Sequence, residues 1–253
     1  NFQEFLIIPN RKYAFADALR VGAELYQELK KLLTRKNLIH SVGDEGGFTP
    51  NLETNKHVLE TLKEVIEASS YRYNEDVFLA LDLAASTFYH DNLYEVDTGR
   101  KKLSQDEYIS YVKGLAQGFH LVSLEDPLPE DEWENWVTLT GECGEHTMIV
   151  GDDLLVTNPK RLKTAIEKKA CNAIVVKVNQ IGTLSETLAV IREAQKAGFK
   201  IIISHRSGET VDHFIADLAA AVGADFVKFG APARGERVVK YNRLLAIYQV
   251  LVS

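Results

Sequence analysis

Cysteine is scarce in this sequence. Only Cys143 and Cys171 occur among its 253 residues, and their separation matches neither a metal-ligand spacing nor a redox motif. We therefore expect two small buried thiols in a reducing compartment, which points to the cytoplasm.

Long apolar runs and an excess of basic charge are also missing. No stretch approaches the roughly 20 apolar residues that a membrane helix needs. Acidic residues outnumber basic ones by 36 to 29, and the formal net charge of -7 repels nucleic-acid phosphates. We therefore expect neither a membrane span nor a nucleic-acid partner, and only local basic groups remain to attract small anions.

The sequence has no methionine at position 1 and no signal peptide. Residues 2–8 already have the apolar character of a strand, and Pro9 follows them. We therefore expect the sequence to start within a longer protein.

Short apolar segments alternate with amphipathic segments along the chain. The expected strands cover residues 2–8, 77–83, 121–124, 148–150, 173–178, 201–204 and 226–229. The expected helices cover residues 15–33, 55–68, 104–118, 130–140, 159–169, 183–197, 210–221 and 235–251, several of them capped by residues such as Ser104, Asn158 and Thr183. Strands that are apolar on both faces and joined by helices predict a parallel sheet.

Such a sheet is either open and doubly wound or closed into a barrel. No glycine-rich phosphate loop follows the first strand, and polar residues stand at the C-terminal ends of successive strands. Both features favour an α/β fold of the TIM barrel type. Seven strands are expected where a closed barrel takes eight, so we expect one strand, with or without a further domain, to precede Asn1.

Charged and polar residues follow the expected strands. They are Asp82, Glu125, Asp126, Asp152, Asp153, Lys177, His205, Arg206, Ser207 and Lys228. In a barrel these positions surround one opening, so we expect the side chains to share one rim. For any one of them, such as Asp126 or Asp153, a salt bridge or a helix cap is the favoured explanation, whereas the whole set favours a bound ligand.

Three carboxylates of this set, Asp82, Glu125 and Asp152, predict a magnesium site, because Mg²⁺ prefers oxygen ligands and zinc prefers nitrogen or sulfur. Lys177 comes on the next strand. A lysine held near metal ions and other cations loses its proton more readily, so Lys177 is a candidate base. Removing a proton next to a carboxylate makes a doubly charged enolate, which needs cations on its oxygens.

Guanidinium and hydroxyl donors in the segment His205-Arg206-Ser207 suit a phosphate, and Lys228 adds a point charge for a carboxylate. The predicted substrate is therefore small and anionic. The longer segment 204–210 could begin a capped helix, but capping explains only its serines and threonine and leaves Arg206 without a role.

Motifs in a fixed order along the whole chain resemble those of the enolase family. They are Gln3-Glu4-Phe5, Gly43-Asp44-Glu45-Gly46-Gly47, Leu81-Asp82, Ala84-Ala85-Ser86, Ser123-Leu124-Glu125-Asp126-Pro127, Asp152-Asp153-Leu154, Thr157-Asn158-Pro159, Lys177-Val178-Asn179-Gln180-Ile181-Gly182-Thr183, Ser204-His205-Arg206-Ser207-Gly208-Glu209-Thr210 and Gly230-Ala231-Pro232-Ala233-Arg234. The resemblance implies that residues 1–253 form the C-terminal barrel domain of an enolase, incomplete at its N-terminus and with a C-terminal tail that is short for the family.

The resemblance also implies an activity, the magnesium-dependent interconversion of 2-phosphoglycerate and phosphoenolpyruvate in glycolysis and gluconeogenesis. In the family, Lys177 would be the base and Glu45 the acid assisted by Glu4, with two Mg²⁺ per active site. The first ion would be held by Asp82, Glu125 and Asp152. The substrate would be bound by Gln3, Glu4, Glu125, Lys177, His205, Arg206, Ser207 and Lys228. The glycines beside Glu45 would let the backbone bend so that the acid reaches the barrel opening.

This sequence departs from the family pattern in one respect. The N-terminal α+β domain, the loop that helps bind the second Mg²⁺, the first barrel strand and a histidine loop that closes on the substrate are not in it. The resemblance implies a homodimer or higher homo-oligomer for the full-length protein. Two alternatives stay open: a barrel fragment that serves as a binding or surface-interaction module, and a related enzyme that acts on a different carboxylate.

Overall fold

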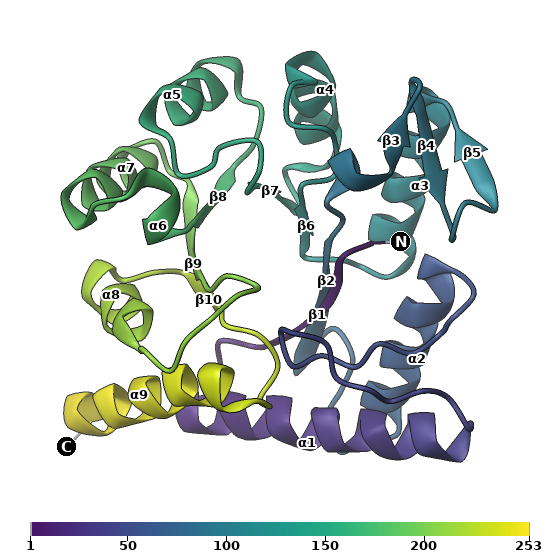
Figure 1. The fold of residues 1–253 in the computed structure, drawn as a ribbon, viewed down its shortest axis with the longest axis vertical. Coiled ribbons are helices and arrows are strands. Elements are labelled where there is room, and N and C mark those ends of the chain that lie inside the picture. The colour runs from purple at the N-terminus through teal and green to yellow at the C-terminus, as the bar shows by residue number, and fades with distance from the viewer. Residues whose placement is uncertain (1, 253) are drawn as a thin grey trace. The chain divides into compact units, whose positions relative to one another are not determined.

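A computed structural model describes residues 2–252 of the chain (Figure 1). Two compact units are present. The first comprises residues up to Leu6, Glu53–Leu59 and Leu79–Ile202, and the second comprises Ile7–Leu52, Glu60–Phe78 and the residues from Ile203 onward. Strands β1, β2 and β9 and helix α2 contribute residues to both units.

Strands and helices alternate through most of the chain, as the sequence predicts. The strands are β1 Glu4–Pro9, β2 Val77–Asp82, β3 Tyr89–His90, β4 Leu93–Val96, β5 Lys101–Leu103, β6 Ser123–Glu125, β7 Met148–Gly151, β8 Ala173–Val176, β9 Lys200–Ser204 and β10 Phe226–Lys228. The helices are α1 Phe15–Arg35, α2 Asn55–Glu67, the 3-10 turn η1 Ala85–Phe88, α3 Gln105–Gly118, α4 Trp133–Cys143, α5 Pro159–Lys168, α6 Val178–Ile181, α7 Leu184–Lys196, α8 Phe214–Val222 and α9 Gly235–Val252.

The first unit is built around a mostly parallel sheet. Its strands lie in the order β1-β2-β6-β7-β8-β9, and β2, β6, β7 and β8 pair in parallel. Every residue of β8 is buried, as are Leu124, Ile149 and Val150 on the two strands before it. Side chains buried on both faces of these strands are the reason for their continuous apolar runs.

Strand β1 runs opposite to β2. The N–H of Asn10, just after β1, donates to the carbonyl of Asp76, just before β2. At the other end, the side chain of Gln3 contacts that of Asp82. Residues at the start of β1 therefore lie beside the carboxyl end of β2. The candidate site residues Gln3 and Glu4 therefore lie at the beginning of β1, whereas the candidates of the parallel strands lie at the carboxyl ends of those strands.

A three-stranded antiparallel sheet, β3-β4-β5, was not expected from the sequence. Asp91 and Asn92 connect its first two strands with φ of 52° and 63°, the left-handed conformation of a tight hairpin turn. Tyr94 of β4 stacks on Tyr108 of α3, with ring centroids 3.8 Å apart. These short strands were missed because each contains few residues and because apolar and polar residues do not alternate clearly along them.

Helices of the second unit pack on one another, α9 against both α1 and α8. Strand β10 lies beside β9 there, and the N–H of His205 donates to the carbonyl of Lys228. The predicted helix 210–221 is shorter than expected: α8 begins only at Phe214, because residues 205–213 form an irregular loop held by side-chain contacts. In the first unit, α4 begins at Trp133 rather than at residue 130.

Candidate functional site

Three buried carboxylates mark the ends of neighbouring strands in the first unit. Asp82 and Glu125 end β2 and β6 and lie opposite each other in register, and Asp152 follows β7 directly. Their exposed fractions are 2%, 2% and 5%. Carboxylate oxygens gathered at neighbouring strand ends are the ligands that a divalent cation such as Mg²⁺ prefers.

Asp126 organises the loop that follows β7. One of its carboxylate oxygens accepts the N–H of Asp152 at 2.9 Å, and the other accepts the N–H of Asp153 at 2.7 Å. Burial and the charge of Asp152 raise the pKa of Asp126, whereas the two N–H donors favour its ionised form. Asp126 therefore holds the loop that follows the next strand of the sheet.

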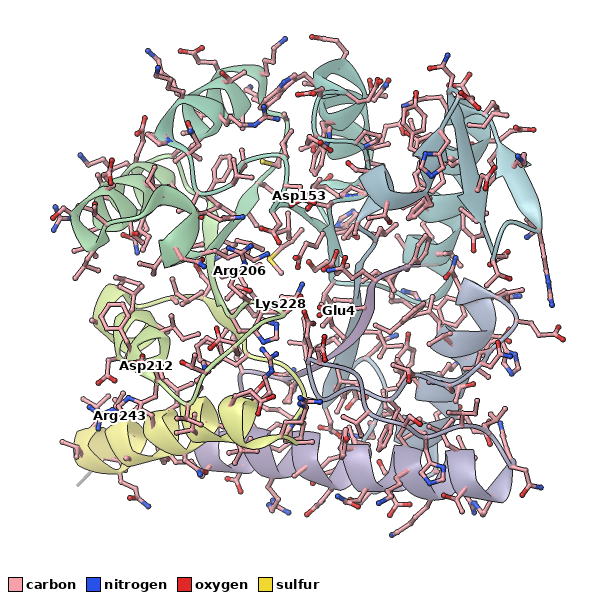
Figure 2. The ribbon with its side chains drawn as sticks, in the orientation of Figure 1. Glu4, Asp153, Arg206, Asp212, Lys228 and Arg243 are labelled. Carbon is pink, nitrogen blue, oxygen red and sulfur yellow. The ribbon has the colours of Figure 1, made fainter. Side chains whose placement is uncertain are left out.

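Asp152 forms a compact acidic group with Asp126 and Asp153, in which one oxygen of each lies within 4.8 Å of the others and to which neither Asp82 nor Glu125 belongs. Burial raises the pKa of Asp153, and the charge of Asp152 adds to that effect. Asp153 lies on the loop after β7 (Figure 2). One oxygen of Asp152, Oδ1, is buried without a hydrogen-bond partner among the described residues. A buried oxygen of this kind fits a metal ligand, since a cation would satisfy it.

Lys177 reaches the same carboxylate. Its Nζ lies 2.5 Å from Asp152 Oδ2, and 17% of its side chain is exposed. Strand β8 ends at Val176 rather than at residue 178, because Lys177 leaves the strand to become the N-cap of α6. The N–H of Lys177 donates to Thr157 Oγ1 at 2.9 Å, and that hydroxyl donates to Gln180 at 2.9 Å. The buried Thr157 thus joins the loop after β7 to the segment that carries Lys177.

Gln3 and Glu4 occupy the start of β1 in this unit. The amide of Gln3 donates to Asp82 Oδ2 at 3.4 Å. The opposite direction of β1 is what brings Gln3 to the carboxyl end of β2. Gln3, a predicted substrate ligand, therefore contacts Asp82, a predicted metal ligand, although the two residues are 79 positions apart in the sequence.

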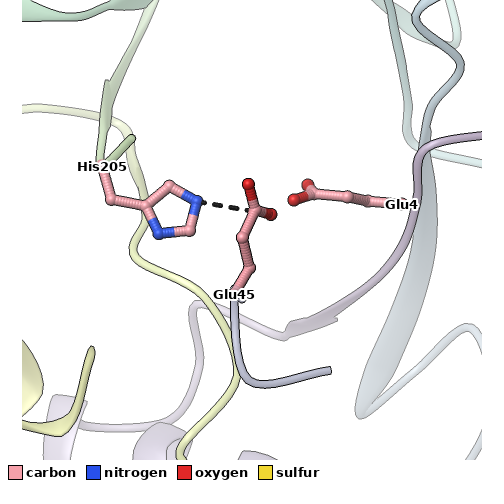
Figure 3. Close-up of side chains that lie close together, drawn as sticks. All are labelled: Glu4, Glu45 and His205. Carbon is pink, nitrogen blue, oxygen red and sulfur yellow. Dashed lines mark ion pairs between the residues drawn. The ribbon is translucent and has the colours of Figure 1, made fainter. Parts of the chain in front are cut away.

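In the second unit, Glu45 contacts two of the predicted residues. Ser207 Oγ donates to Glu45 Oε1 at 2.8 Å, and Nε2 of His205 lies 3.7 Å from Glu45 Oε2 (Figure 3). His205 is 2% exposed. The acid predicted for the loop 43–47 therefore lies beside two members of the segment 205–207.

Close backbone packing holds the loop 43–47 in place. The carbonyl of Glu45 accepts the N–H of Ala231 at 2.9 Å, and a Cβ added to Gly230 would lie 2.5 Å from that carbonyl. Gly46 has a φ of +85°, and Tyr26 donates to its carbonyl at 2.8 Å. The prediction that glycine lets this loop bend is confirmed at Gly46, and Gly230 adds a requirement for close approach.

Arg206 and Lys228 come from neighbouring parts of the second unit. Arg206 follows β9 and Lys228 ends β10 (Figure 2). The N–H of Arg206 donates to Glu209 Oε1 at 3.1 Å. Both side chains carry the positive charge that an anionic substrate needs.

Several supporting residues were missed from the sequence alone. Arg237 and Lys240 are buried cations on α9, with exposed fractions of 0% and 1%, and Thr157 is also fully buried. A buried Arg or Lys in an amphipathic helix carries no signal in the sequence, because the same residues normally lie on solvated faces. The expectation that all candidates share one rim concerns both units together and stays a prediction.

Comparison with known proteins identifies the family. The family model described as "Enolase, C-terminal TIM barrel domain" matches residues 1–253. A protein named Enolase 1, from Methanospirillum hungatei JF-1, is 45% identical over 253 residues. That match takes in 100% of this chain and 59% of the relative, so the chain spans less than two thirds of the relative's length.

Among residues 2–252, no helix is long and apolar enough to cross a membrane. The predicted TIM barrel fold and the predicted family are both confirmed by the family match over residues 1–253. The chain belongs to the enolase family, as a C-terminal TIM barrel domain.

Proposed function

We propose that the protein carrying this sequence is an enolase, a lyase that reversibly dehydrates 2-phosphoglycerate to phosphoenolpyruvate with Mg²⁺. The observation that carries the proposal is the contact between Lys177 and Asp152, 2.5 Å apart beside buried carboxylates. An amine that faces a candidate metal ligand is the arrangement that proton abstraction next to a carboxylate requires.

Asp82, Glu125 and Asp152 would hold the first Mg²⁺. The donor set fits the ion, because all three ligands are oxygen donors and Asp152 Oδ1 is buried without a hydrogen-bond partner within residues 2–252. When bound, the metal supplies positive charge to the carboxylate oxygens of the substrate, which lowers the free energy of the enolate. Asp126 would keep Asp152 in place through the two backbone N–H groups that it accepts.

Different residues would carry out the two proton transfers of the reaction. Lys177 would remove the proton from C2, and Glu45, with Glu4 assisting, would protonate the hydroxyl that leaves from C3. Ser207 donates to Glu45, which leaves that carboxylate oriented by a neighbour.

Substrate binding would use the cationic and polar residues. Arg206 and Ser207 would bind the phosphate, since a guanidinium and a hydroxyl match its oxygens. Lys228 would bind the carboxylate, and Gln3 and His205 would complete the pocket. We further propose a cytoplasmic homo-oligomer that acts in glycolysis and gluconeogenesis, on the strength of the family alone.

A coupled assay of 2-phosphoglycerate dehydration with added Mg²⁺ tests the proposal. The unchanged protein should form phosphoenolpyruvate, and Lys177→Ala should abolish most of that activity. Lys168→Ala is the matched control, because Lys168 is an exposed lysine that forms an ion pair with the exposed Glu134. Absence of magnesium-dependent dehydration in the unchanged protein, or equal rates in Lys177→Ala and Lys168→Ala, would refute the proposal.

A further inference from the structure

A single buried arginine holds the two loops around Glu45 in the second unit. Arg237 of α9 is 0% exposed. Its Nη1 donates to the carbonyl of Arg206 at 2.7 Å, and its Nη2 donates to the carbonyls of Asp44 at 2.9 Å and Ser207 at 2.7 Å. One side chain therefore joins the loop 43–47 to the segment 205–207.

The same guanidinium also contacts the ring of His205. Nη1 of Arg237 lies 2.7 Å from His205 Nδ1. A guanidinium has only donors and stays protonated in proteins, so Nδ1 must be the acceptor and carries no proton. The single proton of the neutral ring is then on Nε2, the nitrogen that lies 3.7 Å from the carboxylate of Glu45.

Among the described residues of the second unit, Arg237 of α9 and Glu45 of the loop 43–47 bring charged side chains to this ring. A doubly protonated ring would set an N–H of Nδ1 against the N–H of Arg237. The loss of that hydrogen bond, with both donors buried, opposes protonation of the ring.

We propose that Arg237 is a positioning residue. It keeps His205 as the neutral tautomer with its proton on Nε2, directed at Glu45, and it fixes the loop 43–47 relative to Ser207. The role in the reaction rests on the proposed function, which assigns Glu45 as the acid. The tautomer itself does not depend on that assignment.

Nitrogen-15 NMR of histidine-labelled protein tests the tautomer directly, because protonated and unprotonated ring nitrogens have well separated chemical shifts. The His205 signals are assigned by their loss in His205→Gln. At pH 7 and at pH 5.5, Nδ1 should appear unprotonated and Nε2 protonated. A proton on Nδ1, in either the neutral or the charged ring, would overturn the proposal, whatever the protein's activity.

Variants of two buried cations on α9 test the role of Arg237. Arg237→Met should remove the fixed tautomer, so that the ring nitrogens show averaged shifts or a charged ring at pH 5.5. Lys240→Met is the matched control: Lys240 is 1% exposed, donates to the carbonyls of Thr210 and Glu236 and forms an ion pair with Glu209, and none of these contacts involves the ring of His205. It should leave the His205 shifts unchanged even if it destabilises the fold.

Unchanged His205 shifts in a folded Arg237→Met protein would contradict the proposal. If Arg237→Met does not fold, Arg237→Lys and the spectrum of the unchanged protein decide the question. In an active protein, Arg237→Lys should lower kcat and also raise KM, since Arg237 contacts the loop that carries the acid and also His205, Arg206 and Ser207, which the proposed function assigns to substrate binding. A protein that shows the predicted tautomer but no dehydration would refute the proposed function and leave the tautomer assignment standing.

Discussion

The Nζ of Lys177 lies 2.5 Å from Oδ2 of Asp152, and both side chains are largely shielded from solvent, with exposed fractions of 17% and 8%. The other oxygen of Asp152 is buried without a hydrogen-bond partner within residues 2–252. One oxygen of Asp152 thus contacts the amine of Lys177, and the other is in a position to bind a cation. This relationship links the candidate base to the candidate metal site.

Substitution of Lys177 tests the base. Lys177→Ala should lower kcat for dehydration by about 10²- to 10⁴-fold, the usual contribution of a positioned general base. Because the substitution also leaves Asp152 without its cationic neighbour, the affinity for Mg²⁺ measured by titration calorimetry should be retained or increased. A fall in Mg²⁺ affinity together with an unchanged kcat would show that Lys177 supports the metal site and is not the base.

Asp126→Asn tests the support of the metal site. An asparagine keeps one acceptor and sets an NH₂ group against the second backbone N–H, so the loop carrying Asp152 and Asp153 should loosen. We expect Mg²⁺ affinity to fall by about 10- to 100-fold, as for other residues that orient metal ligands. The control is Asp131→Asn, whose side chain is 85% exposed and should not affect the titration.

Gly230→Ala tests the close packing against the loop of Glu45. Gly230 and Gly198 have similar positive φ values of +86° and +81°, but only at Gly230 would a Cβ meet other atoms, at 2.5 Å from the carbonyl of Glu45. Gly198→Ala should cost about 1–2 kcal/mol of unfolding free energy from φ alone. Gly230→Ala should cost clearly more in urea unfolding and should also reduce activity. Equal costs would show that the close approach is not required.

Asp76 makes part of the stability of the second unit sensitive to acid. Its ion pairs with Lys12 and Arg72, and the N–H of Arg72, hold its pKa well below the usual range. A carboxyl with a lowered folded-state pKa binds fewer protons when folded. Its stabilising effect is therefore complete above the unfolded-state pKa of about 3.9 and is lost as the pH falls toward the folded-state value.

The corresponding measurement compares Asp76→Asn with the unchanged protein in urea unfolding at pH 7, 4 and 3. The difference in unfolding free energy should be largest at pH 7 and should shrink as the pH falls below about 4. The exposed Asp131→Asn should show little difference at any of the three values. A deficit of Asp76→Asn that grows toward pH 3 would reverse the predicted sign.

The parallel strands and their carboxyl ends could be predicted from the sequence because each is a short apolar run that ends in a charged residue. Asp82, Glu125 and Asp152 were found in this way, since the register of a parallel sheet places such ends side by side. Most helices were predicted to within a few residues, because amphipathic spacing and caps such as Asn158 and Thr183 mark their limits.

Other features depend on contacts that no local pattern encodes. The opposite direction of β1 follows from pairing with β2 across more than 60 residues, so only the structure shows why Gln3 reaches Asp82. Arg237 is spaced along α9 like any solvated arginine, yet its acceptors lie in two distant loops. The roles of Glu45 and Glu4 came from the family resemblance rather than from their spacing, and they stay predictions.

Exchange of the C2 proton of 2-phosphoglycerate with solvent deuterium, followed by proton NMR in the presence of Mg²⁺, tests the central claim most directly. Exchange needs only the base, so the unchanged protein and Glu45→Gln should both lose the C2 proton signal, while only the unchanged protein dehydrates the substrate efficiently. Lys177→Ala should leave the C2 signal intact. Exchange in Lys177→Ala at the rate of the unchanged protein would contradict the account.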